Sequence, residues 1–275
     1  METTSTQQII ITGGHSGIGL ELTKRLVAEG HRVGLVVRNK SRLEGLPEEV
    51  RTRVEPFEAD LSKQADVLAA AQAIRGSWRH VDVLYNNAGL LGDQLRMSPQ
   101  DNELQLEINT VAPYLMTLAL KPALDAAEAP IVVNTATEGM ATQSIDMGHL
   151  FDVKKFRRLF GGYLHSKAAM VQLMADLAAR PEWAKVRIRS VNPGANKTGM
   201  TNGGTGMPWF LRPVGRFLFS APTKGGNLLY QGAFDPTHGE ATGVYLHNNQ
   251  VRPMKVRLAD ADRTRLLGAV RVEWP

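Results

Sequence analysis

The feature that most constrains this chain is a glycine-rich stretch between a short apolar run and a segment of helical periodicity. The apolar run is Ile9 to Thr12, and the helical segment begins at Gly17. Glycine lets the backbone turn sharply and approach a ligand, and the free amides at the start of a helix favour negative charge. A tight strand-to-helix turn would use the same residues. Their placement after a strand and before a helix favours a nucleotide-binding loop.

Short apolar runs alternate with longer helical segments along most of the chain, which is the pattern of β-α-β units and a parallel sheet. We predict seven strands, at Ile9–Thr12, Val33–Val37, Val54–Phe57, Val81–Tyr85, Ile131–Thr135, Arg187–Val191 and Gly243–Leu246. We predict helices at Gly17–Glu29, Lys63–Trp78, Gln100–Ala126, Gly162–Ala179 and Thr223–Phe234, and a helical pattern from Leu258 to Val270. The expected fold class is therefore α/β.

Composition narrows the class of protein. The chain has 275 residues, 43% of them hydrophobic, which fits one domain over residues 1–275. It has no cysteine, so we expect neither a disulfide nor a cysteine-based zinc site, and a cytoplasmic location. The net charge of +5 is spread without a long basic run, so we expect no nucleic-acid partner. The start of the chain lacks the order of a signal peptide, and no apolar stretch is long enough for a membrane span.

Tyr163 and Lys167 are four residues apart, which places them on one face of a helix. A phenol with a pKa of about 10 is a weak acid-base catalyst near neutrality, and a lysine ammonium one turn away favours the phenolate. Such a pair is usually an ordinary helix surface. Beside a nucleotide loop, it indicates proton and hydride chemistry.

The residue that closes the second strand indicates which nucleotide the loop binds. An aspartate or glutamate at this position would accept from a ribose 2′-hydroxyl, whereas Arg38 can pair with a 2′-phosphate. We therefore predict NADP(H), with NAD(H) second, although an ordinary surface arginine is the alternative. Asp60 and Leu61 follow the third strand, where Asp60 would accept from the adenine amino group or cap a loop.

Four motifs in order resemble the short-chain dehydrogenase/reductase family over nearly the whole chain. The motifs are Thr12-Gly13-Gly14-His15-Ser16-Gly17-Ile18-Gly19, Asn86-Asn87-Ala88-Gly89, Tyr163 with Lys167, and Pro193-Gly194 with Thr198. The resemblance implies a Rossmann-type doubly wound parallel seven-stranded sheet with helices on both faces. It also implies a nicotinamide cofactor and interconversion of alcohols and carbonyls without metal.

The resemblance assigns roles to matching residues. Tyr163 would be the general acid or base, and Lys167 would hold the nicotinamide ribose and lower the tyrosine pKa. Asn109 would help to hold a water that joins the lysine to solvent. The cofactor would be bound by Thr12, Gly13, His15, Ser16, Gly17, Ile18, Gly19, Arg38, Asp60, Leu61, Asn87, Ala88, Gly89, Tyr163, Lys167, Pro193, Gly194 and Thr198.

The chain departs from the family at the catalytic serine. Here the sequence is Asn134-Thr135-Ala136-Thr137, and aligning the asparagines places Thr137 at the serine position. A threonine keeps a hydroxyl for a developing oxyanion but adds a methyl group that restricts its side chain. An alignment shifted by one residue would place Ala136 there and remove the hydroxyl.

Two irregular regions carry apolar residues: an insert around residues 138–161 and a lid-like segment around residues 195–222. The insert resembles the retinol-dehydrogenase-like branch, so we expect a hydrophobic carbonyl or alcohol substrate. Sealing of the core by an amphipathic helix would explain the same residues. A non-redox enzyme of this scaffold, such as a dehydratase or epimerase, and an NADP-binding sensor with little turnover are the alternative functions. The protein could form a homo-oligomer, either a dimer or a tetramer, and the sequence leaves the number of subunits open.

Overall fold

The computed structural model describes residues 6–92, 94–137, 148–152, 160–194, 221–254 and 258–271. The strands are β1 (Gln8–Thr12), β2 (Arg32–Val37), β3 (Val54–Glu58), β4 (Val83–Asn86), β5 (Ile131–Thr135), β6 (Arg187–Asn192), β7 (Val244–His247) and β8 (Gln250–Arg252). The longer helices are α1 (Gly17–Ala28), α3 (Gln64–Ser77), α5 (Ala112–Ala119), α8 (Phe160–Ala178), α11 (Pro222–Phe234) and α12 (Asp260–Leu267), and the short ones are α2 (Glu48–Arg51), α4 (Leu104–Leu106), α6 (Lys121–Asp125) and α7 (Gly148–Phe151).

The strands form one sheet in the order β3-β2-β1-β4-β5-β6-β7-β8. Every pairing from β3 to β7 is parallel, with registers such as Ile10 opposite Gly34 and Leu84 opposite Val132. The strand order reverses between β1 and β4. In an open α/β sheet, such a reversal leaves a crevice at the carboxyl ends of the two strands.

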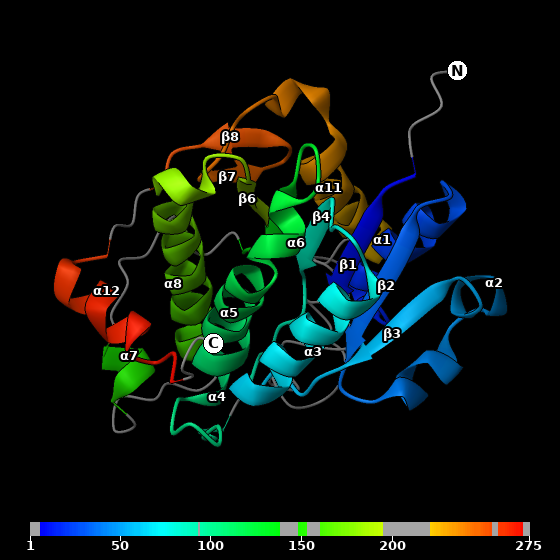
Figure 1. Ribbon diagram of the computed structural model, residues 1–275. Coiled ribbons are helices and arrows are strands. Elements are labelled where there is room, and N and C mark those ends of the chain that lie inside the picture. Colours follow the sequence, from blue (N-terminus) through cyan, green and yellow to red (C-terminus); the bar gives the residue numbers. More distant parts are fainter. Residues whose placement is uncertain are drawn as a thin grey trace.

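Helices cover both faces of the sheet, as Figure 1 shows. One buried cluster joins the sheet to α3, α5 and α8 and includes Ile74, Leu115 and Met174. The other joins the opposite face to α1 and α11 and includes Leu22 and Leu229. The central strands are buried on both faces, which explains their continuous apolar runs. The α/β fold with a Rossmann-type, doubly wound sheet is confirmed.

The prediction of seven strands was wrong by one, because β8 pairs antiparallel with β7 at the edge. Its residues are all exposed, so the strand has no apolar run to reveal it. Asn248 and Asn249 form the two-residue turn before it, with φ angles of 48° and 60°. Asparagine tolerates this left-handed conformation, and a two-residue turn of this kind is typical of hairpins. The Asn248-Asn249 pair was the feature of the sequence that could have predicted this hairpin turn.

The long helix predicted at Gln100–Ala126 is divided in the structure. A short α4 leads into a π turn (Glu107–Val111), which continues as α5 and then α6. Pro113 and Pro122 stand at the starts of α5 and α6, where proline needs no helical amide partner. A π turn inside a helix is rare and is frequently found at functional sites. This one carries Asn109.

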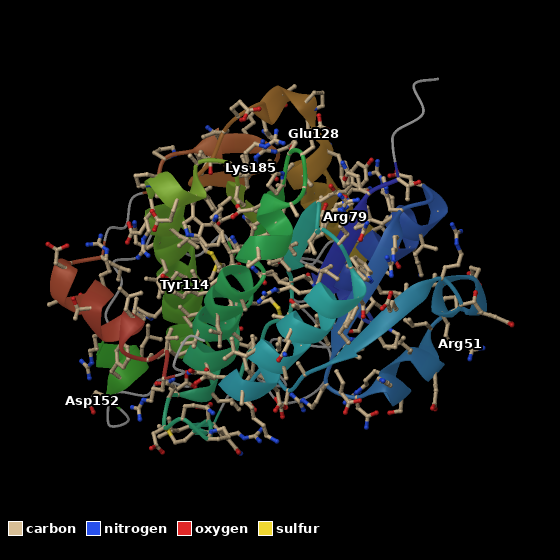
Figure 2. The ribbon with its side chains drawn as sticks, in the orientation of Figure 1. Arg51, Arg79, Tyr114, Glu128, Asp152 and Lys185 are labelled. Atoms are coloured by element: carbon tan, nitrogen blue, oxygen red, sulfur yellow. The ribbon has the colours of Figure 1, made fainter. Side chains whose placement is uncertain are left out.

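Exposed cations occur at several places along the chain. Arg51, Arg79 and Lys185 are all exposed, and Figure 2 shows Arg51 well separated from the other two. Among the described residues, no helix combines the length and the apolar character that crossing a membrane requires.

Candidate active site

The crevice between β1 and β4 is formed by loops that leave in opposite directions. The loop after β1 leads to α1 on one face of the sheet, and the loop after β4 leads toward α5 on the other face. The glycine loop and the Asn86–Gly89 stretch therefore face each other at one edge. Both motifs were predicted to belong to one site, and the structure brings them together.

The glycine loop is shaped by positions that have no room for a side chain. Gly13 and Gly17 have φ angles of 68° and 56°, a region that other residues rarely adopt. A Cβ on Gly19 would lie 2.5 Å from both the Asn87 side-chain nitrogen Nδ2 and the Gly13 carbonyl oxygen. Ser16 is the exposed N-cap of α1, and its hydroxyl makes no capping bond to the described first turn. The loop thus presents backbone amides at the positive end of α1, which suits a phosphate group.

A network around Thr12 holds the glycine loop against the loop after β4. The Thr12 hydroxyl accepts hydrogen bonds from the backbone amides of Asn87 and Ala88, each at 3.0 Å. The Asn87 amide group donates to the carbonyl oxygens of Thr12 at 3.1 Å and Gly13 at 3.3 Å. Thr12 and Asn87 therefore fix the shape of the crevice. Ile18 anchors the start of α1 by packing against the apolar core.

Charged groups gather near the end of β2. Arg38 is two-thirds exposed, and its Nε lies 3.8 Å from Asp60 Oδ1. That carboxylate oxygen also accepts from the backbone amide of Ser62 at 3.0 Å and from its hydroxyl at 2.8 Å. Burial raises the pKa of Asp60, but the bonds from Ser62 and the Arg38 and Lys63 charges outweigh it, so the pKa is lowered. Asp60 therefore caps its own loop.

His15 lies half-buried in the glycine loop. Burial and the nearby positive charge of Arg42 lower the pKa of its imidazole. Its Nδ1 atom is buried and has no hydrogen-bond partner among the residues that the structure describes. Together with Arg38 and Arg42, it gives this end of the crevice the character of an anion site. Leu61, after β3, packs against the core on the other face.

The predicted catalytic side chains meet at the carboxyl ends of β5 and the start of α8. The Thr137 side chain lies near the Tyr163 phenol, where it acts to lower the pKa of that phenol. The Lys167 ammonium donates to the Thr135 carbonyl oxygen at 2.8 Å. A Cβ on Gly89 would lie 3.4 Å from Lys167 Nζ and 3.2 Å from Asn109 Oδ1, so the absence of a side chain at Gly89 lets both buried groups pack close to its backbone.

Burial favours the neutral form of both members of the tyrosine-lysine pair. It raises the pKa of Tyr163 to about 12, against the opposing effect of the Thr137 side chain. Burial also lowers the pKa of Lys167 to about 8. The expected lowering of the Tyr163 pKa is thus not found. Loss of hydration destabilises the phenolate by more than the Thr137 side chain stabilises it. The phenol therefore keeps its proton near neutrality.

Asn109 connects the π turn to α8 and to the loop after β4. Its side-chain amide donates to the Leu90 carbonyl at 2.8 Å and to the Ser166 hydroxyl at 3.0 Å, and its Oδ1 accepts from the Leu90 amide at 2.7 Å. The Ser166 hydroxyl in turn donates to the Tyr163 carbonyl at 2.8 Å. Asn109 therefore supports the helix turn that carries Tyr163 and Lys167.

The stretch after β6 is described only in part. Gly194 has a φ angle of 76°, and its amide donates to Asn192 Oδ1 at 2.9 Å, which forms the turn after Pro193. Thr198 and residues 195–220 of the lid-like segment lie outside the described residues, as does most of the insert before Tyr163. Within that insert, α7 and Asp152 are described.

Residues that the motifs did not indicate also shape the site. Thr135 supplies the carbonyl that Lys167 binds, and its hydroxyl donates to Asn87 Oδ1 at 3.3 Å. Ser166 links Asn109 to the helix, and its place beside Lys167 in the sequence was a usable clue. Tyr245 donates from its hydroxyl to the Thr137 carbonyl oxygen at 3.2 Å. Nothing in the local sequence of β7 points to that contact.

Among the described residues, no group of three or more histidine or carboxylate side chains is arranged to hold a metal ion. The fold and the site together define a Rossmann-type protein with a tyrosine, a lysine and a threonine at the mouth of a nucleotide crevice.

A family model described as short chain dehydrogenase matches residues 7–149. Retinol dehydrogenase 11 from Homo sapiens is 28% identical over 222 residues, which cover 79% of this chain and 69% of that protein. Nodulation protein G from Rhizobium sp. (strain N33) is 30% identical over 199 residues, which cover 71% of this chain and 76% of that protein. The chain belongs to the short-chain dehydrogenase family and resembles its retinol-dehydrogenase-like branch.

A solved structure agrees with this assignment. The 3-ketoacyl-(acyl-carrier-protein) reductase from Brucella melitensis, solved in complex with NADH, has a TM-score of 0.65 and 26% sequence identity. The match covers 87% of this chain and 95% of that one. The family model, the relatives and the solved structure together identify the chain as an oxidoreductase of this family.

Proposed function

We propose that the protein is an NADP(H)-dependent reductase of hydrophobic carbonyl compounds, with Tyr163 as the general acid. The observation that carries the proposal is the convergence of Tyr163, Thr137 and Lys167 beside the glycine crevice. Family membership supports hydride transfer as the type of chemistry. No metal is needed, because the proton donor and the oxyanion donor are both side chains.

The crevice fits a dinucleotide. The close approach of Gly13 to Ala88 and of Gly19 to Asn87 leaves backbone at the surface of the loop, where a side chain would block a pyrophosphate. Arg38 and His15, together with the Arg42 charge, favour an anion at the ribose end, which supports the phosphorylated cofactor. Thr12 and Asn87 would hold the two loops of the crevice in place, and Gly194 would do the same for the turn after β6.

When bound, NADPH supplies the hydride that reduces the carbonyl carbon and is released as NADP⁺. The Tyr163 phenol gives its proton to the carbonyl oxygen, so that the C=O bond becomes H–C–O–H. The Thr137 hydroxyl, whose side chain lies near Tyr163, donates to the oxygen as negative charge develops there. Lys167, with a pKa near 8, is suited to return a proton to the phenolate after each turnover.

The raised pKa of Tyr163 bears on the preferred direction of the reaction. A phenol that is still protonated at neutral pH is ready to act as an acid, which carbonyl reduction requires. Alcohol oxidation needs the phenolate, which burial disfavours. We therefore propose reduction as the favoured direction near neutrality.

The test is a substrate panel with purified protein, NADPH or NADH, and carbonyl compounds of graded size and polarity. We expect loss of nicotinamide absorbance with NADPH and with aromatic or lipophilic ketones and aldehydes. Faster turnover of small polar carbonyls would contradict the proposed substrate class. Binding of NADPH without oxidation by any compound would instead favour a sensor.

A further inference from the structure

Two alternate residues of β7 reach toward loops at the active-site edge of the sheet. The Tyr245 hydroxyl donates to the Thr137 carbonyl oxygen at 3.2 Å, and His247 Nδ1 lies 2.9 Å from Asn192 Nδ2. Residues two apart on a strand point to the same face. Asn192 Oδ1 accepts from the Gly194 amide, so His247 supports the turn after β6 in the same way that Tyr245 supports the segment after β5.

The segment after β5 is held at three successive residues. The Thr135 carbonyl accepts from Lys167 at 2.8 Å, the Ala136 amide donates to the Val191 carbonyl at 2.8 Å, and the Thr137 carbonyl accepts from Tyr245. The first bond comes from α8, the second from β6 and the third from β7. Of these three bonds, the one from Tyr245 acts on Thr137 itself.

We propose that Tyr245 is a positioning residue for Thr137 and, through it, for the Tyr163 phenol. This inference rests on the proposed function of the site. Threonine is branched at Cβ and has few side-chain rotamers, so the direction of its hydroxyl follows the orientation of its backbone. A bond that fixes the Thr137 carbonyl therefore fixes the hydroxyl that reaches Tyr163.

Burial strengthens the argument. Tyr245 is 3% exposed, and a buried phenol needs a hydrogen-bond partner to offset its lost contact with water. Its ring packs in the core cluster with α8, so the ring stays in place when the hydroxyl is removed. Tyr245→Phe is therefore a clean test of the hydroxyl alone.

The catalytic test compares Tyr245→Phe with wild type in carbonyl reduction by NADPH. We expect kcat to fall by about fivefold to tenfold, which corresponds to the loss of one neutral hydrogen bond. KM for NADPH should change by less than about twofold, because the change leaves the glycine loop intact.

The matched control is Tyr85→Phe. Tyr85 is fully buried on β4, and its hydroxyl has no hydrogen-bond partner in the described part of the chain. Removing the same atom there should leave kcat and the pH profile as in wild type. Equal effects in the two variants would assign the Tyr245 result to general loss of a buried hydroxyl and overturn the proposal.

A double-mutant cycle tests whether Tyr245 acts through Thr137. The Thr137→Val variant lacks the hydroxyl that Tyr245 is proposed to position. Adding Tyr245→Phe to this variant should therefore lower kcat little further. Full additivity of the two losses would contradict the proposal. Thermal unfolding of each variant shows whether it is folded, and the cycle is read at a temperature where all four proteins are native.

A measurement without substrate separates this inference from the proposed function. The chain has five tyrosines, so labelling them with ¹³C at Cζ gives a simple spectrum. The Tyr163 signal is assigned by its loss in Tyr163→Phe. We expect that signal to shift in Tyr245→Phe and to stay in place in Tyr85→Phe. An unmoved Tyr163 signal in Tyr245→Phe overturns the positioning role, whereas absence of turnover in wild type overturns the proposed function alone.

Discussion

The Thr137 side chain lies near the Tyr163 phenol and acts to lower its pKa, which supports Thr137 as the residue at the serine position of the family motif. Ala136, the alternative in a shifted alignment, is buried in the core. The sequence left both residues open. Thr137, and not Ala136, is the residue that affects the pKa of the phenol, so we keep Thr137 as the proposed oxyanion donor.

Thr137→Ala should lower kcat by about 10²-fold, because it removes a hydrogen-bond donor for the developing oxyanion. Thr137→Ser keeps the hydroxyl and should retain kcat within about tenfold of wild type. The measurement is steady-state carbonyl reduction with saturating NADPH. Equal rates for wild type and Thr137→Ala would show that the hydroxyl has no role in the reaction.

Arg38→Asp should move cofactor preference from NADPH toward NADH by about 10-fold to 100-fold, because a carboxylate repels a 2′-phosphate and accepts from a ribose hydroxyl. The measurement is the ratio of kcat/KM for the two cofactors. Arg51→Asp makes the same change of charge on an exposed arginine of α2, well away from the other labelled cations in Figure 2. That control should keep the wild-type ratio, and an equal effect of both variants would refute a local phosphate contact.

Gly19→Ala should weaken NADPH binding at least about tenfold and destabilise the fold by roughly 1–3 kcal/mol, because its Cβ would lie 2.5 Å from the Gly13 carbonyl. The matched control is Gly76→Ala in α3, where a Cβ meets nothing within 4 Å. That change should raise the free energy of unfolding by about 0.5–1 kcal/mol. Calorimetric binding and urea unfolding report the two effects, and tight NADPH binding by Gly19→Ala would be inconsistent with the proposed loop contact.

Lys167→Met should change how stability depends on pH. The pKa of Lys167 is about 8 in the folded protein and 10.5 as the ordinary value, so the unfolded chain binds more protons between these pH values. The wild-type free energy of unfolding therefore gains from this group as pH rises from 8 to 10.5, by on the order of 3 kcal/mol. A methionine side chain does not titrate, so we expect the stability of the variant relative to wild type to fall over this window. Parallel urea curves at several pH values measure the difference, and a constant gap would mean that Lys167 titrates normally.

The fold was largely predictable because its signals are local. Continuous apolar runs mark strands buried on both faces, and each of the seven predicted strands is present. The edge strand β8 was not predictable from apolar pattern, because Gln250, Val251 and Arg252 are all exposed. The division of the helix around Asn109 also escaped the pattern, since apolar periodicity continues through a π turn.

The site was predictable where function requires a particular residue type at a fixed spacing, as for Gly13, Tyr163 and Lys167. It was not predictable where the contact depends on tertiary structure. Tyr245 is more than a hundred residues from Thr137, and only the sheet order brings them together. The direction of the Tyr163 pKa shift escaped prediction for the same reason, because burial is a property of the folded chain.

Transfer of a label from cofactor to substrate tests the central claim most directly. The protein is incubated with NADPH carrying deuterium at the reactive carbon and with a lipophilic ketone, and the alcohol is analysed by mass spectrometry. We expect deuterium on the carbinol carbon with wild type, and a rate about 10²–10⁴-fold lower with Tyr163→Phe at unchanged NADPH affinity. Undiminished transfer by Tyr163→Phe would contradict the account.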